Sequence, residues 1–362
     1  RPTGRFAYER IATIADHLHF TNTKTIRAGI GTPEEDKAGG GHAHCGTMVY
    51  LGDNWPTKYR GQVFMNNIHG RRVNMDVLSR KGSGYTATHA PDVMRAADPW
   101  FVGVSLAYGP DGGVYVSDFS DTGECHHTRN TRKHTGRIYK ITYGKPKQWR
   151  GDIGKLKTEE LVALQLHDND WFVRHARRVL HERLVYTHKI WSPSSPDPEE
   201  NHAAWRSFRD GCFAEMDAVL KQQFAEHQSV PKRLRALWAL YAFDGMEADD
   251  LMALFKDRNE HVRAWAIQLL MNDFRMARGV VASLTEMAEN DKSPLVRLYL
   301  ASAAQRVPLN SRAPLLKALL AHGEDVDDPN LPLMYWYATE PVVAADPMTG
   351  VQLLAVCKLP KV

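Results

Sequence analysis

The chain has 362 residues, of which 43% are hydrophobic and 24% charged, as in an ordinary globular protein. This composition excludes collagen-like, coiled-coil and wholly disordered chains. The formal net charge of +4 is too small to indicate nucleic-acid binding. No apolar run approaches the roughly 18 residues that predict a membrane span. The sequence begins at Arg1 without a Met or an apolar leader, so we expect a piece of a longer protein.

Two parts with different compositions meet near residue 150. Residues 1–150 hold 19 of the 26 glycines and carry 21 basic against 13 acidic residues. Residues 151–362 hold 7 glycines and carry 25 basic against 29 acidic residues. Glycine and proline punctuate the first part, as in short strands joined by turns, whereas the second part has helical periodicity. We therefore predict a multidomain β + α protein with domains at 1–145 and 146–362.

Short strands are predicted throughout the first part. Four runs, each bounded by turn residues, lie at 46–52, 61–67, 71–78 and 83–89. A second set follows at 101–108, 113–118 and 136–143, with a turn of sequence GPDG at 109–112. The repeat of about 55 residues matches one four-stranded meander, which favours the blades of a partial β-propeller.

The strand order predicts a polar rim at one end of these sheets. Successive turns of a meander alternate between its two ends, so every second connection shares one end. Most histidines of the first part fall in those connections. The candidate site residues there are His42, His44, Cys45, His69, Arg71, Arg72, Trp100, Asp118, Asp121, Cys125 and His126.

These residue types suggest several kinds of chemistry. His44 and His69 could take a proton from a hydroxyl group, and Arg71 or Arg72 could hold an anionic cofactor or a carboxylate. We expect Trp100, Asp118 and Asp121 to contact substrate, and the two carboxylates could alternatively orient a histidine or bind Ca²⁺. Purely structural loop roles remain open for all of them.

The nitrogen and sulfur donors of the rim could instead bind a transition metal such as Zn or Cu. The candidate ligands are His42, His44, Cys45, Cys125 and His126. A disulfide between Cys45 and Cys125 is the other possibility, because both lie at the same rim. The chain has no Cys-x-x-Cys-His motif, so it carries no covalent haem of its own.

A repeated helical pattern fills the second part. Val262 and Val296 occupy equivalent positions 34 residues apart, each after a capping Asn or Ser. This period predicts a HEAT-like α-solenoid, interrupted by a Pro/Ser-rich insertion near 190–200. The recurring Arg174, Arg263 and Arg297 are expected to pair with acidic groups between repeats.

Several motifs of the first part resemble a known family. They are GGGHAHCG at 39–46, YLGDNWP at 50–56, NNIHGRRVN at 66–74, GPDG at 109–112, TGECH at 122–126 and GRIY at 136–139. Together they resemble the planctomycete-type membrane-bound dehydrogenases. In that family a propeller similar to glucose/sorbosone dehydrogenases precedes HEAT-type repeats and often a terminal cytochrome c module. The resemblance covers residues 1 to about 145 and continues more loosely through the helical part.

This resemblance implies a fragment of an exported or periplasmic oxidoreductase that oxidises a carbohydrate or alcohol. It implies a quinone cofactor (PQQ-like) with Ca²⁺, or a transition metal, and haem c only on a module missing from this chain. The expected partners are a small-molecule or polysaccharide substrate, and a cytochrome or other protein docked on the HEAT repeats. We expect neither nucleic-acid binding nor a membrane span. The alternative is a non-catalytic propeller/HEAT scaffold that binds carbohydrate or protein.

Overall fold

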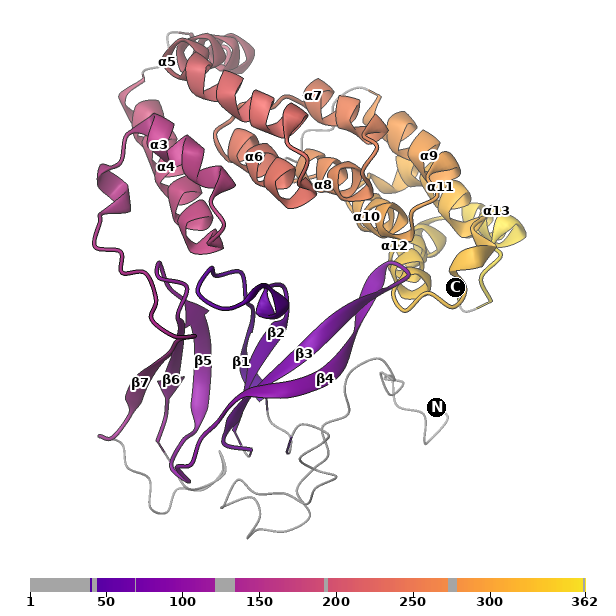
Figure 1. The fold of residues 1–362 in the computed structure, drawn as a ribbon. Helices are drawn as coiled ribbons and strands as arrows, with labels where there is room; N and C mark the ends of the chain where they lie inside the picture. Colours follow the sequence, from indigo (N-terminus) through magenta and orange to yellow (C-terminus); the bar gives the residue numbers. More distant parts are fainter. Residues whose placement is uncertain are drawn as a thin grey trace. The chain divides into compact units, whose positions relative to one another are not determined.

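The computed structural model describes residues 40, 44–68, 70–120, 134–191, 195–272, 279–360 and 362. The chain divides into two compact units, and neither is continuous in sequence. The first comprises Arg1–Ser79, Tyr85–Lys155 and His167–His175, and the second comprises Arg80–Gly84, Leu156–Leu166 and Ala176–Val362. Two antiparallel sheets form the body of the first unit, and helices form the body of the second (Figure 1). The protein is therefore a multidomain mixture of β and α structure.

The first sheet is a meander with the strand order β1-β2-β3-β4. Its strands are β1 (His44–Val49), β2 (Val63–Asn67), β3 (Arg72–Lys81) and β4 (Gly84–Arg95). All four predicted strands are confirmed, although β4 continues past its predicted end at residue 89. The strand can include Pro91, which has no N–H, because β4 is at the edge of the sheet among the described strands.

The second sheet has the order β5-β6-β7 and confirms the second predicted set of strands. It contains β5 (Gly103–Tyr108), β6 (Val114–Asp118) and β7 (Arg137–Ile141). The predicted turn joins β5 to β6: the Gly112 N–H donates to the Gly109 carbonyl over 3.0 Å. Gly112 has a φ of 71°, and a Cβ there would lie 2.4 Å from the Asn54 nitrogen, so glycine is required.

An aromatic core joins the two sheets of the first unit. Strands β1 and β2 both contact β5, and the Tyr50 and Phe64 rings stack with their centroids 5.5 Å apart. The Tyr50 hydroxyl donates to the Gly112 carbonyl over 2.8 Å and accepts from the Trp55 N–H over 3.0 Å. Burial is the main cause of the raised pKa of Tyr50, so the ring remains a neutral hydrogen-bonding core residue.

The second unit is built mainly from helices, together with short 3₁₀ turns. The helices are α3 (Thr158–Ala163), α4 (Asp170–Ile190), α5 (Pro198–Glu226), α6 (Val230–Ala242), α7 (Ala248–Ala253), α8 (Glu260–Leu270), α9 (Val280–Asn290), α10 (Pro294–Ala304), α11 (Leu309–Leu320), α12 (Leu331–Ala345) and α13 (Pro347–Val356). The first residues of α4 belong to the first unit. The predicted insertion coincides with the break between α4 and α5, part of which lies outside the described residues.

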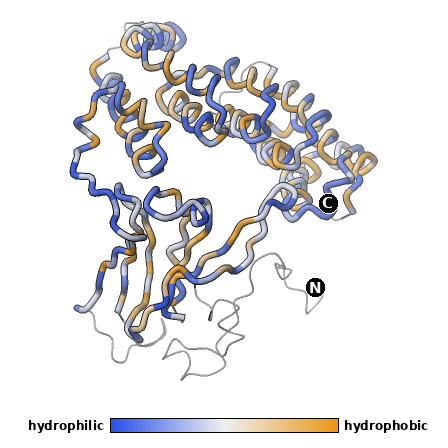
Figure 2. The backbone as a smooth tube through the Cα atoms, viewed as in Figure 1, coloured by the Kyte–Doolittle hydropathy of each residue, from blue (hydrophilic) through white to orange (hydrophobic). Residues whose placement is uncertain are grey.

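From α8 onward, each helix packs against the helix two places further along the chain. Helix α8 contacts α10, α9 contacts α11, α10 contacts α12, and α11 contacts α13 (Figure 1). Apolar and hydrophilic positions recur along these helices, as Figure 2 shows. The predicted caps are confirmed: the Asn259 side chain accepts from the His261 N–H, and that of Ser293 accepts from the Val296 N–H.

Recurring arginine–aspartate pairs, which we call the arginine–aspartate ladder, connect successive helical segments. Arg263 pairs with Asp291 at 2.6 Å, as predicted for this recurring arginine. Arg297 repeats the contact with Asp325 at 2.5 Å, and it also donates to the Asp291 carbonyl over 3.1 Å. These arginines therefore stabilise the stack.

Among the residues that the structure describes, no helix is long and apolar enough to cross a membrane.

Candidate functional site

Polar side chains gather at one end of the first sheet. This end receives the start of β1, the end of β2, the start of β3 and the end of β4, as the meander predicts. Register pairs His44 with Asn67 and Asn67 with Arg72, so these three residues share one face. Arg72, Asn74 and Asp76 then follow at every second position of β3 and are all buried. We call His44, Asn67, Arg72, Asn74, His89 and Asp92 the rim network.

Asn74 is the centre of the rim network. Its Nδ2 donates to Asp92 Oδ1 over 2.6 Å, and its Oδ1 lies 3.1 Å from both His44 Nε2 and Asn67 Nδ2. Asn67 in turn accepts from the Gly70 N–H over 2.7 Å. A buried side-chain network of this kind holds its members in one arrangement, because each lost bond would leave a buried polar group unsatisfied.

The network determines which nitrogen of His44 carries the proton. The Asp92 carboxylate only accepts hydrogen bonds, so the NH₂ group of Asn74 must face it. The amide oxygen of Asn74 therefore faces His44, and this oxygen also only accepts. Nε2 of His44 must therefore be the donor, so when the ring is neutral its lone pair is on Nδ1.

Arg72 anchors the acidic side of the network. Its guanidinium is fully buried, pairs with Asp92 at 3.0 Å and donates through Nε to the Gly70 carbonyl over 2.9 Å. Gly40 lies against this guanidinium: a Cβ at residue 40 would be 2.3 Å from Arg72 Cζ. His89 flanks the same carboxylates, with Nδ1 3.4 Å from Asp76 Oδ1 and Nε2 3.7 Å from Asp92 Oδ1.

Arg71 links the two sheets of the first unit at this end. It has a φ of 49°, which is uncommon for a residue other than glycine. Its buried Nη1 donates to the Phe101 carbonyl over 3.0 Å, and its own carbonyl accepts from the Ala96 N–H over 2.9 Å. Arg71 and Arg72, which the sequence suggested as anion-binding residues, therefore both contact protein groups inside the fold.

A second polar group lies at the corresponding end of the other sheet. Asp118 is buried, accepts from the Val102 N–H over 2.8 Å and pairs with Arg137 at 2.7 Å. Arg137 also pairs with Asp98 at 2.6 Å, and Asp98 accepts from the Trp100 N–H over 2.8 Å. The Trp100 N–H and then Arg137 hold the pKa of Asp98 below its usual range, although burial opposes the shift. Asp118 and the Trp100 backbone thus organise the loop here.

A cavity of about 490 Å³ lies beside Asp98, within the size range of small-molecule pockets. Met94, Phe101, Tyr139 and Lys140 are among its lining residues. His44 does not line it, so this cavity and the rim network are separate features of the first unit.

Cys45 is held as a neutral thiol. Burial raises the pKa of this thiol, and its Sγ donates to the Gly103 carbonyl over 3.3 Å. Metal binding requires a thiolate, which this environment disfavours. Within the described ranges, no three His, Cys, Asp or Glu side chains lie close enough together to hold a metal ion. The candidates His42, His69, Asp121, Cys125 and His126 lie outside those ranges.

The described residues do not fit an anionic quinone with Ca²⁺. Such a group needs cationic side chains facing it and carboxylate oxygens to bind the ion. Arg72 is instead committed to Asp92, and the Asp118 oxygens accept from Arg137 and from backbone N–H groups.

The network also includes four residues that were not among the predicted site residues, namely Asn67, Asn74, His89 and Asp92. For Asn74 the signal was the alternation of Arg72, Asn74 and Asp76, which places three polar residues on one face of β3. Asn66 lies outside the rim network but was also not predicted. It is fully buried, and neither its Nδ2 nor its Oδ1 has a hydrogen-bond partner in the described structure. Such unsatisfied groups are uncommon and need a structural or functional explanation.

Comparison with known proteins finds a match to one family model over part of the chain. Residues 4–145 match a family described as a domain of unknown function (DUF7133). No curated protein and no solved structure matches the chain. The family match covers less than half of the chain, and it includes both sheets and the rim network.

Proposed function

We propose that the first unit forms blades of a β-propeller whose rim oxidises a hydroxyl group of a carbohydrate or alcohol. Two antiparallel sheets in contact, with β1 and β2 of one against β5 of the other, support the propeller. The regular contacts between helices two places apart support a HEAT-like solenoid in the second unit. The motifs at 39–46 and 66–74, which resemble planctomycete-type dehydrogenases, supply the reaction class.

The observation that carries this proposal is the chain of hydrogen bonds from His44 through Asn74 to Asp92. Oxidation of an alcohol removes a proton from oxygen and a hydride from carbon. We assign the proton to His44, whose lone pair on Nδ1 can accept it while Asn74 keeps Nε2 protonated. The positive charge that then forms on the ring is stabilised by the Asp92 carboxylate, one residue further along the chain of hydrogen bonds.

The hydride passes with its two electrons to a diffusible two-electron acceptor, such as a quinone or the redox dye of the assay, because the described residues do not fit a bound quinone or a metal. We propose that electrons finally pass to a haem module of the same exported protein or of a partner. No step of the chemistry assigned to His44 depends on the identity of that acceptor.

Dye reduction by the purified chain tests the proposal. We expect some member of a panel of sugars and alcohols to reduce a redox dye, and His44→Ala to lower turnover about 10²–10⁴-fold. His134→Ala is the matched control, because His134 is exposed and lies outside the rim network. Reduction that is equal in wild type and His44→Ala would refute the role of His44, and no reduction by any substrate would refute the dehydrogenase.

The second candidate is a non-catalytic scaffold that binds carbohydrate or protein. It is supported by the burial of Arg71 and Arg72, whose guanidinium groups contact the Phe101 carbonyl and Asp92. On this account the rim network stabilises a binding surface. His44→Ala should then weaken ligand binding in a protein that has no turnover to lose.

A further inference from the structure

The cavity beside Asp98 runs along one edge of strand β7. Its lining includes the four successive residues 139–142, at the end of this strand. Successive side chains of a strand point to opposite faces of its sheet, so a cavity over one face would be lined by alternate residues only. Among the described strands, β7 pairs with β6 alone. Backbone N–H and C=O groups on its other side therefore lie along the cavity, where they can donate and accept hydrogen bonds.

Aromatic and apolar side chains form the other walls. Met94, Ala96 and Phe101 come from the segment that leads from the end of β4 to β5. The ring of Phe101 lies 6.1 Å from that of Tyr139, measured between centroids, and the two rings are tilted by 50°. Tyr139 is 37% exposed, so part of its ring is open. Rings of this kind offer a broad apolar surface to the C–H groups of a ring-shaped ligand.

Asp98 is the fixed polar group of the cavity. Its Oδ1 accepts from the Trp100 N–H over 2.8 Å, and its Oδ2 accepts from Arg137 over 2.6 Å. These bonds hold the carboxylate in one orientation and keep its pKa below the usual range, although burial opposes the shift. An ionised carboxylate only accepts hydrogen bonds and has about four lone-pair sites, so about two remain for a ligand.

The charged side chains of the lining are already paired. They are Asp98 and Lys140. Asp98 pairs with Arg137, and Lys140 pairs with Asp111. A charged ligand would lose its hydration here without meeting an unpaired opposite charge, whereas a neutral ligand has no such cost. The cavity therefore favours a ligand without net charge.

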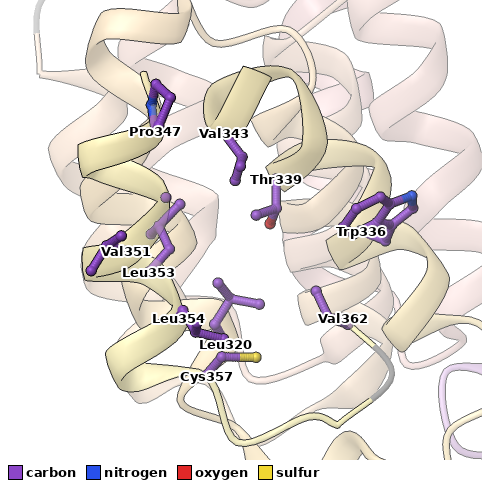
Figure 3. A pocket seen from close by; sticks show the side chains of 11 residues that line it. Leu320, Trp336, Thr339, Val343, Pro347, Val351, Leu353, Leu354, Cys357 and Val362 are labelled. Atoms are coloured by element: carbon purple, nitrogen blue, oxygen red, sulfur yellow. The ribbon is translucent and has the colours of Figure 1, made fainter. Parts of the chain in front are cut away.

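The groove between α12 and α13 in the second unit lacks this combination. It encloses about 310 Å³, and Figure 3 shows Val351 and Leu354 of α13 along one wall and Trp336 and Thr339 of α12 along the other. No formally charged side chain is among its described lining residues. This groove has no fixed carboxylate that could select a hydroxyl group, so it serves as a reference for nonspecific apolar binding.

We propose that the cavity beside Asp98 binds a neutral sugar ring. Hydroxyl groups both donate and accept, which matches the Asp98 carboxylate on one side and the edge of β7 on the other. The C–H groups of the ring pack against Tyr139 and Phe101. A purely apolar ligand would remove water from Asp98 without replacing its hydrogen bonds. The site is independent of the proposed reaction, because no residue of the rim network lines it.

The methyl group of Met94 gives a local readout of this site, because Met94 lines the cavity. Nuclear magnetic resonance of the full chain, labelled with ¹³C at the methionine methyl groups, follows it, and Met94→Leu identifies its signal. We expect at least one of glucose, galactose and mannose to shift the Met94 signal saturably. The signal of Met348, which is 70% exposed on α13, should not move. A Met94 signal that none of the three sugars shifts would overturn the proposal, and the proposed reaction would still stand.

Two comparisons test how the sugar is recognised. Tyr139→Ala removes one aromatic wall and should raise the dissociation constant about 10-fold, whereas Tyr186→Ala, at a tyrosine 67% exposed on α4, should leave it unchanged. The other methionine signals show whether Tyr139→Ala is folded. The second comparison needs no variant: charged analogues, such as glucuronate and glucosamine for glucose, should bind more weakly than the neutral sugar. A folded Tyr139→Ala that titrates like wild type, or charged analogues that bind equally well, would contradict the assignment.

Discussion

The arginine–aspartate ladder makes a quantitative prediction at Arg297. This side chain and that of Asp325 are each only 3% exposed, and both carboxylate oxygens accept from the guanidinium, at 2.7 and 2.5 Å. Arg297→Ala removes both bonds and leaves Asp325 with the Tyr335 hydroxyl at 2.7 Å. Breaking a buried ion pair in this way costs about 3–5 kcal/mol of unfolding free energy.

A matched variant separates burial from the mere loss of an ion pair. Arg178 pairs with Glu182 at 3.3 Å, but these side chains are 64% and 61% exposed. Water screens such a pair, so Arg178→Ala should cost only about 0.3–0.5 kcal/mol. Replacing both partners of the buried pair, as in Arg297→Met/Asp325→Leu, should recover most of the stability lost in Arg297→Ala.

Urea unfolding followed by far-ultraviolet circular dichroism gives these free energies by linear extrapolation. For a helical unit of this size, each kcal/mol corresponds to about 2–4 °C, so Arg297→Ala should melt about 6–20 °C below wild type. If Arg297→Ala is no more destabilising than Arg178→Ala, the ladder does not stabilise the stack. If the double replacement is as unstable as Arg297→Ala, the lost charge pairing is not the cause.

Two further predictions concern the remaining turns and contacts. The Ser83 N–H donates to the Asp328 carboxylate over 2.7 Å, and burial raises the pKa of Asp328 less than its hydrogen bonds from Ser83, Asn330 and Leu331 lower it. A pKa that is lowered in the folded state adds stability at pH values above the unfolded-state pKa of about 3.9. The greater stability of wild type over Asp328→Asn in urea should therefore disappear as the pH falls below about 4. A difference in unfolding free energy that does not change with pH would contradict this. Gly46 and Gly61 both have positive φ, but a Cβ at Gly46 would lie 2.3 Å from the Val104 oxygen whereas nothing lies within 4 Å at Gly61. Gly61→Ala should lower the free energy of unfolding by roughly 1–2 kcal/mol through left-handed backbone strain, and Gly46→Ala should lower it by well over that amount. Equal melting temperatures of the two variants would refute the close contact at Gly46.

The strands and caps were predictable because they depend on local chemistry. The turn at Gly109–Gly112 requires Pro and Gly at fixed positions, and Asn259 and Ser293 cap helices through their own side chains. The predicted end of β4 at residue 89 is too early. A strand can continue through Pro91 only at the edge of a sheet, and the sequence does not show which strand lies at the edge.

The rim could be predicted as a location but not as a network. The meander order places His44 and the Arg71–Arg72 pair at one end, yet the partner of Arg72 is Asp92, on the neighbouring strand β4 and 20 residues away. Sequence alone could not distinguish an arginine that faces substrate from one that is buried against a carboxylate. Cys45 illustrates the same limit, since its raised pKa results from burial and not from its neighbours in the motif.

Chemical rescue of His44→Ala tests whether His44 accepts the proton of the substrate hydroxyl. A missing general base can be replaced by a small base in solution when the cavity that it leaves is accessible. Added imidazole should restore substrate-dependent dye reduction in His44→Ala, with no effect on His134→Ala. Turnover by His44→Ala that equals wild type without imidazole, or that imidazole does not increase, would contradict the assignment.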